Sequence, residues 1–462
     1  MGWLGVLLVG WGVVGLGWAW GAGDGAKGAP NLLFILTDQQ YAGAMSCAGN
    51  LDVSTPAIDS LAARGVRFES AYCSQPLCLP SRVAMVTGAY PHEFEATHNA
   101  PKWERALVPL LGSVLSAGGY QCAWFGKWHL PLEPSKTAEH GFAIVEHDRG
   151  RGNDERIAGA VSRFLARPDG RPFFVVASFT NPHNICEWAR GEPTPEGPIP
   201  PPPPPEACPA LPQNYEIPFD EPEVIRAIQA RHPPGYPTTG WAPDRWRQYR
   251  WAYCRLVEKV DAEVRRLLDV IEERGVAGTT IVIFSSDHGD GNGAHRWNQK
   301  QVLYEEATRV PFVITTPGMR AGRVDRDHLI DAGLDLYPTL CDFARVKPPP
   351  HLRGRSVRPL LEDAASASWR EHVVCETEFA ANSGGMGISG RLVRTGRYKY
   401  ICYSEGGRRE QFFDIQKDPG ESLNLIGVPE LAAGIREHRE RLARWCRETG
   451  DAFPVPGTAG SP

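Results

Sequence analysis

Two acidic residues, Asp38 and Asp287, stand shortly after runs of apolar residues at positions 32–36 and 281–284. In open α/β sheets, functional sites form beyond the carboxyl ends of strands, so chemistry is expected at both positions. Two carboxylates brought together repel each other unless a cation lies between them. A hard divalent ion with oxygen ligands, Ca²⁺ first among them, answers that need. The alternative is that each Asp only caps a turn, as a single Asp after a strand commonly does.

Cys78 begins the pentapeptide Cys-Leu-Pro-Ser-Arg, which ends at Arg82. Pro80 suits the first turn of a helix that runs to Gly88, so residue 78 is expected near a helix N-terminus. The free backbone N–H groups and the helix dipole at that end favour an anion. The alternative is a coincidental pentapeptide around a packed or disulfide-bonded cysteine, and five residues alone do not decide between the two.

Cationic side chains occur in three further segments. Lys127 and His129, two residues apart in an extended segment, are expected to point to the same side. His183 follows the apolar run at 173–177, and Lys300 lies in the segment 298–301. Each alone could be an ordinary surface or loop residue. The net charge of -5 draws no anion to the protein, so any bound anion must be held by local charge of this kind.

These segments, in this order, resemble the type I sulfatases of the alkaline-phosphatase-like superfamily. The resemblance spans about residues 30–430 and is strongest at 78–82, 126–129 and 285–289. In that family a dedicated maturation enzyme oxidises the motif cysteine to formylglycine, an aldehyde whose hydrate is the nucleophile. The resemblance therefore implies that Cys78 is the precursor of a catalytic aldehyde and that this chain has the maturation enzyme as a partner.

The resemblance also implies a site for one divalent ion, taken as Ca²⁺. Its ligands would be Asp38, Gln39, the residue at position 78, Asp287 and His288. Gln39 stands where many members carry a second Asp, and His288 stands where many carry Asn. Both differences reduce the negative charge on the ion, and imidazole is an unusual ligand for calcium.

The family's catalytic roles are carried over residue by residue. The resemblance assigns Lys127 and Lys300 to the sulfate, and His129 to the hydroxyl of the nucleophile. It assigns Arg82 to an oxygen of the hydrated aldehyde. It assigns His183 to the leaving oxygen, which this histidine would protonate.

The activity implied is hydrolysis of a sulfate ester, with Asp287 as the base and the second hydroxyl of the hydrate expelling sulfate. Tryptophans at 103, 188, 241 and 246 suit a sulfated polysaccharide or glycosaminoglycan substrate, although ordinary packing explains each equally well. One alternative is a phosphate or phosphonate ester hydrolase on the same scaffold. Another is an exported carbohydrate-binding pseudoenzyme whose Cys78 stays unmodified. The ester, the linkage position, exo or endo action and the oligomeric state stay open.

The elements that must position these residues alternate between short apolar runs and helical segments, which predicts an α/β fold. The resemblance implies a large mixed, mostly parallel sheet flanked by helices. A helix is expected to start at Thr55-Pro56, and a long one is expected over 248–274. The proline-rich segment 192–218 is expected to be an extended surface loop.

A smaller C-terminal α+β domain is expected after the prolines at 348–350. Strand-like pieces at 372–375 and 398–401 precede a helix over 429–449. The expected organisation is therefore a signal peptide at 1–21, a catalytic domain at 30–350 and a C-terminal domain at 351–462.

Composition bounds the cellular context. The apolar residues 1–21 predict a signal peptide cleaved before Ala22, although no Lys or Arg precedes the run; the alternative is an uncleaved anchor. An exported, periplasmic or extracellular protein is expected, with no stable membrane association if the segment is cleaved. The net charge favours neither nucleic acid nor an anionic membrane. Eleven cysteines leave at least one unpaired, and their pairing cannot be predicted from their spacing.

Overall fold

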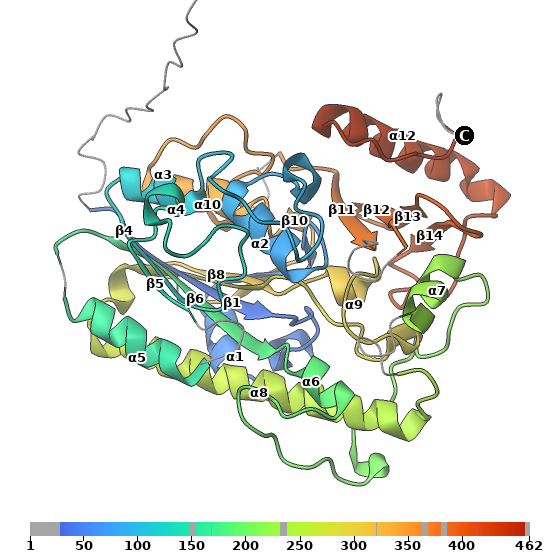
Figure 1. The fold of residues 1–462 in the computed structure, drawn as a ribbon, viewed down its shortest axis with the longest axis horizontal. Coiled ribbons are helices and arrows are strands. Elements are labelled where there is room, and N and C mark those ends of the chain that lie inside the picture. Colours follow the sequence, from blue (N-terminus) through green and yellow to red (C-terminus); the bar gives the residue numbers. More distant parts are fainter. Residues whose placement is uncertain are drawn as a thin grey trace, which may run out of the picture.

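The computed structural model describes residues 28–147, 154–167, 169–231, 238–319, 321–362, 368–379 and 386–457. The expected signal peptide at 1–21 lies outside these ranges. The chain forms one large sheet covered by helices, with a second, smaller sheet beside it (Figure 1). This arrangement confirms the predicted fold class.

The large sheet has eight strands in the order β5-β4-β6-β1-β7-β8-β2-β9. In chain order they are β1 (Asn31–Asp38), β2 (Val66–Phe68), β4 (Gln121–Gly126), β5 (Ile144–Glu146), β6 (Phe173–Pro182), β7 (Thr280–Ser286), β8 (Phe312–Thr315) and β9 (Arg323–Asp325). Strand β1 lies at the centre and pairs in parallel with β6 and β7, while β8 is antiparallel to its neighbours. The sheet is therefore mixed and mostly parallel.

Helices cover both faces of this sheet, which is why its central strands are apolar runs without alternation. One face carries α1 (Pro56–Ala62), α5 (Asp154–Leu165), α6 (Ile185–Arg190) and α8 (Pro243–Glu273). The other carries α2 (Cys78–Thr87), α3 (Leu111–Ala117), α4 (Thr137–His140) and α10 (Leu336–Ala344). The long helix α8 begins at Pro243, five residues before the predicted start, because proline fits a first helical turn.

The second sheet is antiparallel, in the order β11-β12-β13-β14. Its strands are β11 (His372–Phe379), β12 (Ile388–Thr395), β13 (Tyr398–Tyr403) and β14 (Glu410–Asp414), and α12 (Ala432–Thr449) packs on β12 and β13. All of these elements follow residue 351; the division of the chain into domains at this position stays a prediction. The remaining elements are β3 (Ala71–Tyr72), β10 (Ile330–Asp331), α7 (Glu223–Arg231), α9 (Glu305–Thr308) and α11 (Arg358–Glu362).

The proline-rich segment is an extended loop with a single 3-10 turn at Pro205–Ala207, as predicted. All eleven cysteines lie in the described part of the chain, and each is a free thiol. Among the described helices, none combines the length and the apolar character that crossing a bilayer would require.

Candidate active site

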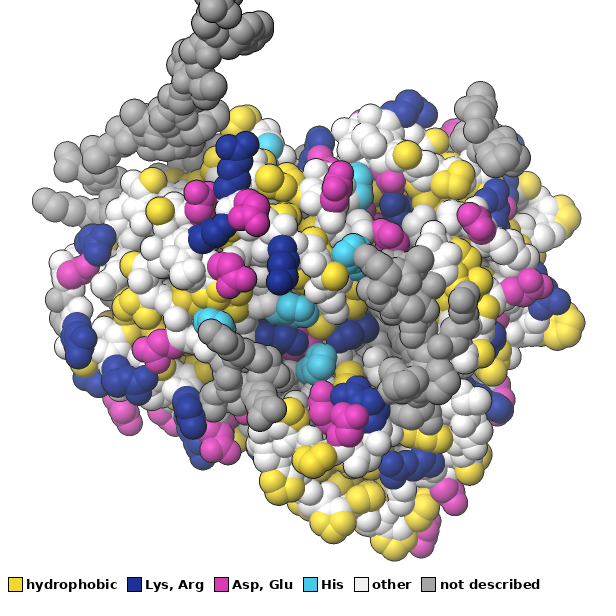
Figure 2. Space-filling view, in the orientation of Figure 1, with side chains coloured by type: hydrophobic (Ala, Val, Ile, Leu, Met, Phe, Trp, Pro, Cys, Tyr) yellow, Lys and Arg dark blue, Asp and Glu magenta, His cyan; other side chains and the backbone are white. Residues whose placement is uncertain are grey.

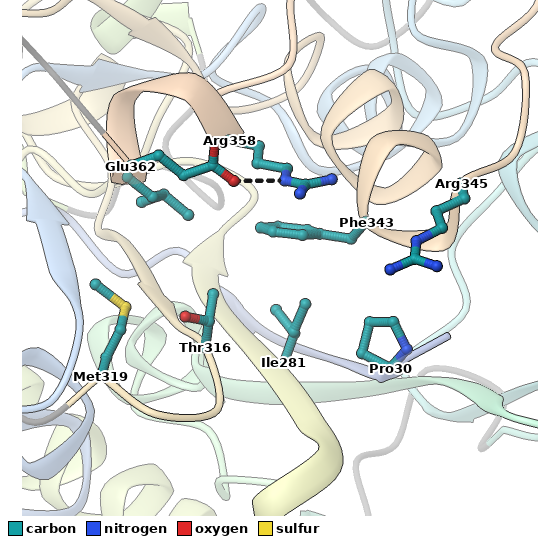
Figure 3. Close-up of a pocket in the computed structure, with 9 residues that line it drawn as sticks. Pro30, Ile281, Thr316, Met319, Phe343, Arg345, Arg358 and Glu362 are labelled. Carbon is teal, nitrogen blue, oxygen red and sulfur yellow. Dashed lines mark hydrogen bonds and ion pairs between the residues drawn. The ribbon is translucent and has the colours of Figure 1, made fainter. Parts of the chain in front are cut away.

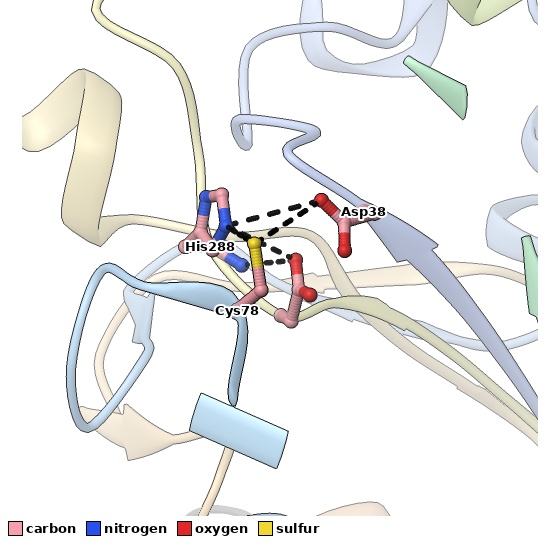
Figure 4. A group of neighbouring side chains, drawn as sticks. Asp38, Cys78 and His288 are labelled. Atoms are coloured by element: carbon pink, nitrogen blue, oxygen red, sulfur yellow. Dashed lines mark hydrogen bonds and ion pairs between the residues drawn. The ribbon is translucent and has the colours of Figure 1, made fainter. Parts of the chain in front are cut away.

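The two carboxylates predicted to meet do so at the carboxyl ends of neighbouring strands. Asp38 is the last residue of β1, and Asp287 follows β7 directly. The backbone N–H of Asp287 donates to the carbonyl of Thr37 at 3.2 Å, which holds the two strand ends together. Cys78, the first residue of α2, lies against them (Figure 4). All three side chains are buried.

Four potential metal ligands converge here, from Asp38, Cys78, Asp287 and His288, and their ligand atoms all lie within 4.8 Å of one another. His288 Nε2 is 3.2 Å from Cys78 Sγ and 3.9 Å from Asp38 Oδ1 (Figure 4). The other ring nitrogen, Nδ1, donates to the carbonyl of Gly289 at 2.8 Å, so Nε2 turns its lone pair toward the group. Such an outer hydrogen bond is what orients a metal-binding histidine.

The charges of this group fit a divalent cation. Burial, and then the neighbouring Asp38, raise the pKa of Asp287 to about 7. Burial also opposes ionisation of Asp38, but Lys127, His183 and Arg82 outweigh it and hold the pKa of that carboxyl well below its ordinary value. Mutual repulsion of two buried carboxylates is relieved by an ion between them.

Gln39 occupies the edge of the same group. Its Oε1 accepts a hydrogen bond from Lys300 Nζ at 3.0 Å, and its Nε2 donates to Asp290 Oδ2 at 2.7 Å. Its amide oxygen therefore faces the site while its amide nitrogen faces away. Its role as a metal ligand stays a prediction.

Arg82 lies inside the protein and its guanidinium grips both carboxylates. Nε donates to Asp287 Oδ2 at 2.9 Å, and Nη2 donates to Asp38 Oδ2 at 3.0 Å. Nη1 donates to Ser178 Oγ at 2.9 Å. Arg82 thus fixes the relative position of the two carboxylates, whereas its predicted contact with an aldehyde oxygen stays a prediction.

Lys127 and His129 both reach the site, but not through the extended segment that was predicted. Strand β4 ends at Gly126, and His129 has a left-handed backbone with φ of 42°. Only glycine fits at 126, because a Cβ there would lie 2.1 Å from the carbonyl oxygen of Ser178. Lys127 Nζ lies 2.6 Å from Asp38 Oδ2. Burial lowers the pKa of His129 while the nearby Cys78 acts to raise it, so this ring lies close to position 78.

His183 and Lys300 complete the cationic wall. His183 follows β6 directly, as predicted, and its pKa responds to Lys300, Lys127 and Asp38, so its ring lies beside these charges. Lys300 Nζ lies 2.9 Å from Cys78 Sγ. Burial and Asp38 act to raise the pKa of the Cys78 thiol, but Lys300, Lys127 and His288 outweigh them and hold it well below its ordinary value. The structure brings together every predicted site residue, around a position that favours an anion.

Three polar residues at the site were missed in the sequence. These residues are Ser178, Asp290 and Tyr249. Ser178 accepts a hydrogen bond from Arg82, and Asp290 accepts hydrogen bonds from Gln39 and from the hydroxyl of Tyr249. Ser178 interrupts an apolar strand and Asp290 follows His288 by two residues, so a polar residue inside or beside a strongly apolar run is the signal that could have found them.

The predicted sugar-binding tryptophans fall into two pairs. Trp103 and Trp246 are buried in apolar clusters, so they pack the core and cannot present a face to a sugar. Trp188 and Trp241 are half-buried and hold the guanidinium of Arg245, whose Cζ lies 4.1 Å and 5.2 Å from the two ring centres. The aromatic argument for a carbohydrate substrate is therefore wrong for the first pair.

The site is reachable from outside. The side chain of His183 is 24% exposed and that of Lys127 is 13% exposed. Figure 2 shows histidine and basic side chains gathered near the middle of one face of the molecule.

A separate cavity of about 280 Å³ contains Pro30, before β1, and Ile281, near the start of β7 (Figure 3). Its Arg358 is already paired with Glu362, 2.9 Å away, and its other walls are largely apolar. It lies at the opposite ends of these strands from Asp38 and Asp287, so it is separate from the candidate active site.

Comparison with known proteins gives consistent matches over nearly the whole chain. The family model Sulfatase matches residues 30–346, and the model N-sulphoglucosamine sulphohydrolase, C-terminal, matches residues 293–448. A Delta 4,5-hexuronate-2-O-sulfatase of Bacteroides thetaiotaomicron is 31% identical, covering 94% of this chain and 92% of its own. An N-acetylglucosamine-6-O-sulfatase of the same bacterium is 26% identical, covering 92% and 88%. The solved structure of a 2-O GAG sulfatase superposes with a TM-score of 0.80 at 30% identity, covering 92% and 93%.

Proposed function

The chain belongs to the sulfatase family of the alkaline-phosphatase-like superfamily, and we propose that it releases sulfate from a sulfated polysaccharide or glycosaminoglycan, using formylglycine formed from Cys78 and a Ca²⁺ ion. One observation carries the proposal. The side chain at position 78 lies 2.9 Å from Lys300 Nζ and belongs to a group of four metal-type ligands. Sulfuryl transfer needs a nucleophile at a point where developing negative charge is already neutralised.

The ion would be held by Asp38, Asp287, His288, the side chain at position 78 and, as predicted, Gln39. When bound, the ion supplies positive charge to the sulfuryl oxygens, and formylglycine supplies a geminal diol as the nucleophile. The orientation of His288 and the repulsion between the two carboxylates support the fit of a divalent cation. The low thiol pKa at position 78 supports a site arranged for an anionic oxygen.

The lysines of the chain would bind the sulfuryl oxygens. Lys300 is only 7% exposed, so its charge acts in a medium of low dielectric where it stabilises an anion strongly. Lys127 already lies beside Asp38 and needs only to turn toward the substrate. Arg82, committed to the two carboxylates, would keep the ligands in place rather than bind the substrate.

The histidines would handle protons. Burial, then Lys300 and Lys127, lower the pKa of His183, which makes its protonated form a stronger acid toward a departing alcohol. Its partial exposure places it where the alcohol would leave. His129, against Cys78, is placed to assist the second hydroxyl as sulfate is expelled.

The substrate class rests on the relatives, which are named for hexuronate 2-O-sulfate, N-acetylglucosamine 6-O-sulfate and glycosaminoglycan sulfate. They agree on a sulfated carbohydrate and differ in sugar and position. Export would bring the enzyme to such polymers, and the apolar residues 1–21 suit a signal peptide. The maturation enzyme would act on the segment 78–82 before or during export.

The test is a release assay with the matured, Ca²⁺-loaded enzyme. We expect sulfate release from sulfated uronate or glucosamine oligosaccharides, with kcat/KM well above that for an aryl phosphate or phosphonate. A preference for the phosphorus esters would overturn the proposed reaction. Hydrolysis of aryl sulfate without any action on a panel of sulfated oligosaccharides would overturn the proposed substrate class.

A further inference from the structure

Asp290 lies behind the site and contacts none of the groups expected to react. It is buried, and its carboxylate accepts four different donors. Gln39 Nε2 donates to Oδ2 at 2.7 Å, and the Tyr249 hydroxyl lies 3.0 Å from both oxygens. The backbone N–H groups of Asn292 and Gln299 donate at 2.7 Å and 3.1 Å. A carboxylate with these four partners acts only as an acceptor.

Two of these hydrogen bonds, those from Gln299 and Gln39, connect Asp290 indirectly to Lys300. Gln299 is its chain neighbour and has a left-handed backbone with φ of 63°, a conformation that needs support from its surroundings. The hydrogen bond from Gln299 N–H to Asp290 Oδ2 supplies such support. The second route passes through Gln39, whose Oε1 accepts from Lys300 Nζ at 3.0 Å.

The amide of Gln39 has two chemically different ends, and Asp290 determines which end faces Lys300. A flipped amide would place its oxygen against the carboxylate of Asp290 and its N–H₂ against the ammonium of Lys300. Both contacts would then be repulsive, acceptor against acceptor and donor against donor. The thiol of Cys186, 3.5 Å from Nε2 and 3.6 Å from Oε1, is a weak partner that favours neither orientation.

We propose that Asp290 is a positioning residue that holds Lys300 in its sulfate-binding place, through the oriented amide of Gln39 and the backbone of Gln299. The inference rests on the proposed role of Lys300 in binding the sulfuryl group. The orientation of Gln39 also matters for the ion, because the amide oxygen, and not the amide nitrogen, then faces the candidate metal site. Gln39 and Asp290 thus act together: Gln39 presents its amide oxygen to the site as an acceptor, and Asp290 holds that amide in this orientation.

The test measures binding of inorganic sulfate and of Ca²⁺ to the full, matured chain by calorimetry. Removing a side chain that orients a metal ligand typically costs about 10–100-fold in metal affinity, and we expect a loss of this size for Ca²⁺ in Asp290→Asn, together with a weaker affinity for sulfate. Gln39→Glu alone should also lower the affinity for sulfate, because the carboxylate introduced at position 39 would then lie against that of Asp290 and repel it. The double variant Gln39→Glu/Asp290→Asn should lose less sulfate affinity than the sum of the two single losses. The reason is that the amide introduced at position 290 can donate to the carboxylate introduced at position 39.

Asp261→Asn provides the matched control. Asp261 is a buried carboxylate on α8, and it accepts the backbone N–H groups of Ala57 and Ile58, away from the site. This variant should lose stability without losing sulfate affinity. If Asp290→Asn does not fold, Gln39→Leu, which leaves Asp290 and Lys300 in place, should show the same loss of affinity.

The outcomes separate the two proposals. Sulfate affinity in folded Asp290→Asn or Gln39→Leu equal to that of the parent would overturn the positioning role. Strictly additive losses in the double variant would also overturn it. No sulfate binding by the parent chain itself would instead count against the proposed function.

Discussion

At the scale of single residues, position 78 is defined by the charges around it. Lys300 Nζ lies 2.9 Å and His288 Nε2 lies 3.2 Å from Cys78 Sγ. The pKa of another buried cysteine shifts in the opposite direction from that of Cys78: burial raises the pKa of Cys186 to about 12. The difference is local positive charge, which makes this one thiol position suitable for an anionic nucleophile.

Replacing Cys78 should therefore abolish turnover. Cys78→Ala is expected to reduce sulfate release to background, and Cys78→Ser to at most one turnover, because a serine sulfate lacks a second hydroxyl to expel the sulfate. The measurement is sulfate release over many enzyme equivalents, with Cys446→Ala as a control that keeps activity. Undiminished turnover in Cys78→Ala would refute the scheme. An unmodified thiol in the tryptic peptide of an active parent enzyme would refute formylglycine.

The role of His183 predicts a dependence on the leaving group. A general acid contributes about 10²–10⁴-fold when the leaving group is a poor one such as a sugar alkoxide. His183→Ala should therefore lower kcat/KM on a sugar sulfate by about that factor, and much less on 4-nitrophenyl sulfate, whose phenolate leaves unaided. Lys300→Ala, the comparison variant, should lower both alike because it acts on the sulfuryl group. Equal losses on both substrates in His183→Ala would exclude the acid role.

The pH dependence follows from the same residue. The pKa of His183 is lowered by burial and by Lys300 and Lys127, and the acid must be protonated to act. In the parent enzyme kcat/KM on sugar sulfates should then fall as pH rises through a value below about 6.5, the ordinary pKa of histidine.

At the scale of elements, the strand ends were predictable and the contacts between distant segments were not. Asp38 and Asp287 follow uninterrupted apolar runs, and Pro80 marks a helix start, so short-range patterns placed all three elements. The hydrogen bond between Gln39 and Asp290 joins residues 251 positions apart, and no local pattern reports such a pair.

The backbone of His129 shows a different limit. The sequence suggested an extended segment, but His129 has a left-handed backbone with φ of 42°, which the alternation of side chains in an extended segment does not predict. The start of α8 was missed because its first turns carry aromatic and charged residues rather than the Leu and Val pattern that marks the rest. Pro243 is the local signal that marks this start.

The junction of α5 with β6 contains a pair of acids that links stability to pH. The carboxylate of Asp154 accepts the backbone N–H groups of Thr180 and Asn181, just before His183. Burial, and then the neighbouring Glu196, raise its pKa to about 8. The folded chain therefore holds a proton that the unfolded chain releases near pH 4, so the free energy of unfolding falls as pH rises between about 4 and 8.

Glu196→Gln should flatten this dependence. The substitution removes the Glu196 charge, the second cause after burial of the raised pKa of Asp154. The side-chain oxygen of the glutamine can still accept the N–H of Asp154, as Glu196 does at 3.0 Å. One proton retained by the folded state corresponds to about 1.4 kcal/mol per pH unit, and part of this slope should disappear. The measurement is the unfolding midpoint from pH 5 to pH 9 for both proteins. Parallel curves would contradict the assignment.

At the scale of the whole molecule, a buried ion cluster joins the second sheet to the catalytic sheet. Lys399 on β13 lies 3.1 Å from Glu305 Oε1 on α9 and 2.7 Å from Glu421 Oε1. Glu421 Oε2 in turn accepts the backbone N–H of Glu305 at 2.6 Å. Because α9 begins five residues after Lys300, this cluster ties the C-terminal sheet to the segment that carries Lys300, the lysine proposed to bind sulfate. The small sheet thus supports the segment that positions Lys300.

Lys399→Met should cost about 3–5 kcal/mol of stability, because removing one partner of a buried ion pair leaves an uncompensated charge. The loss should be smaller at pH 5 than at pH 8: the unpaired Glu305 binds a proton in the folded state, so the stability of the variant falls as pH rises. Lys399→Met/Glu305→Gln, which removes two of the three charges of the cluster and leaves Glu421, should regain part of the loss at pH 8. Denaturant unfolding at both pH values measures these differences. A single variant as stable as the parent, or a double variant less stable than the single one, would show that the cluster does not hold the two sheets together.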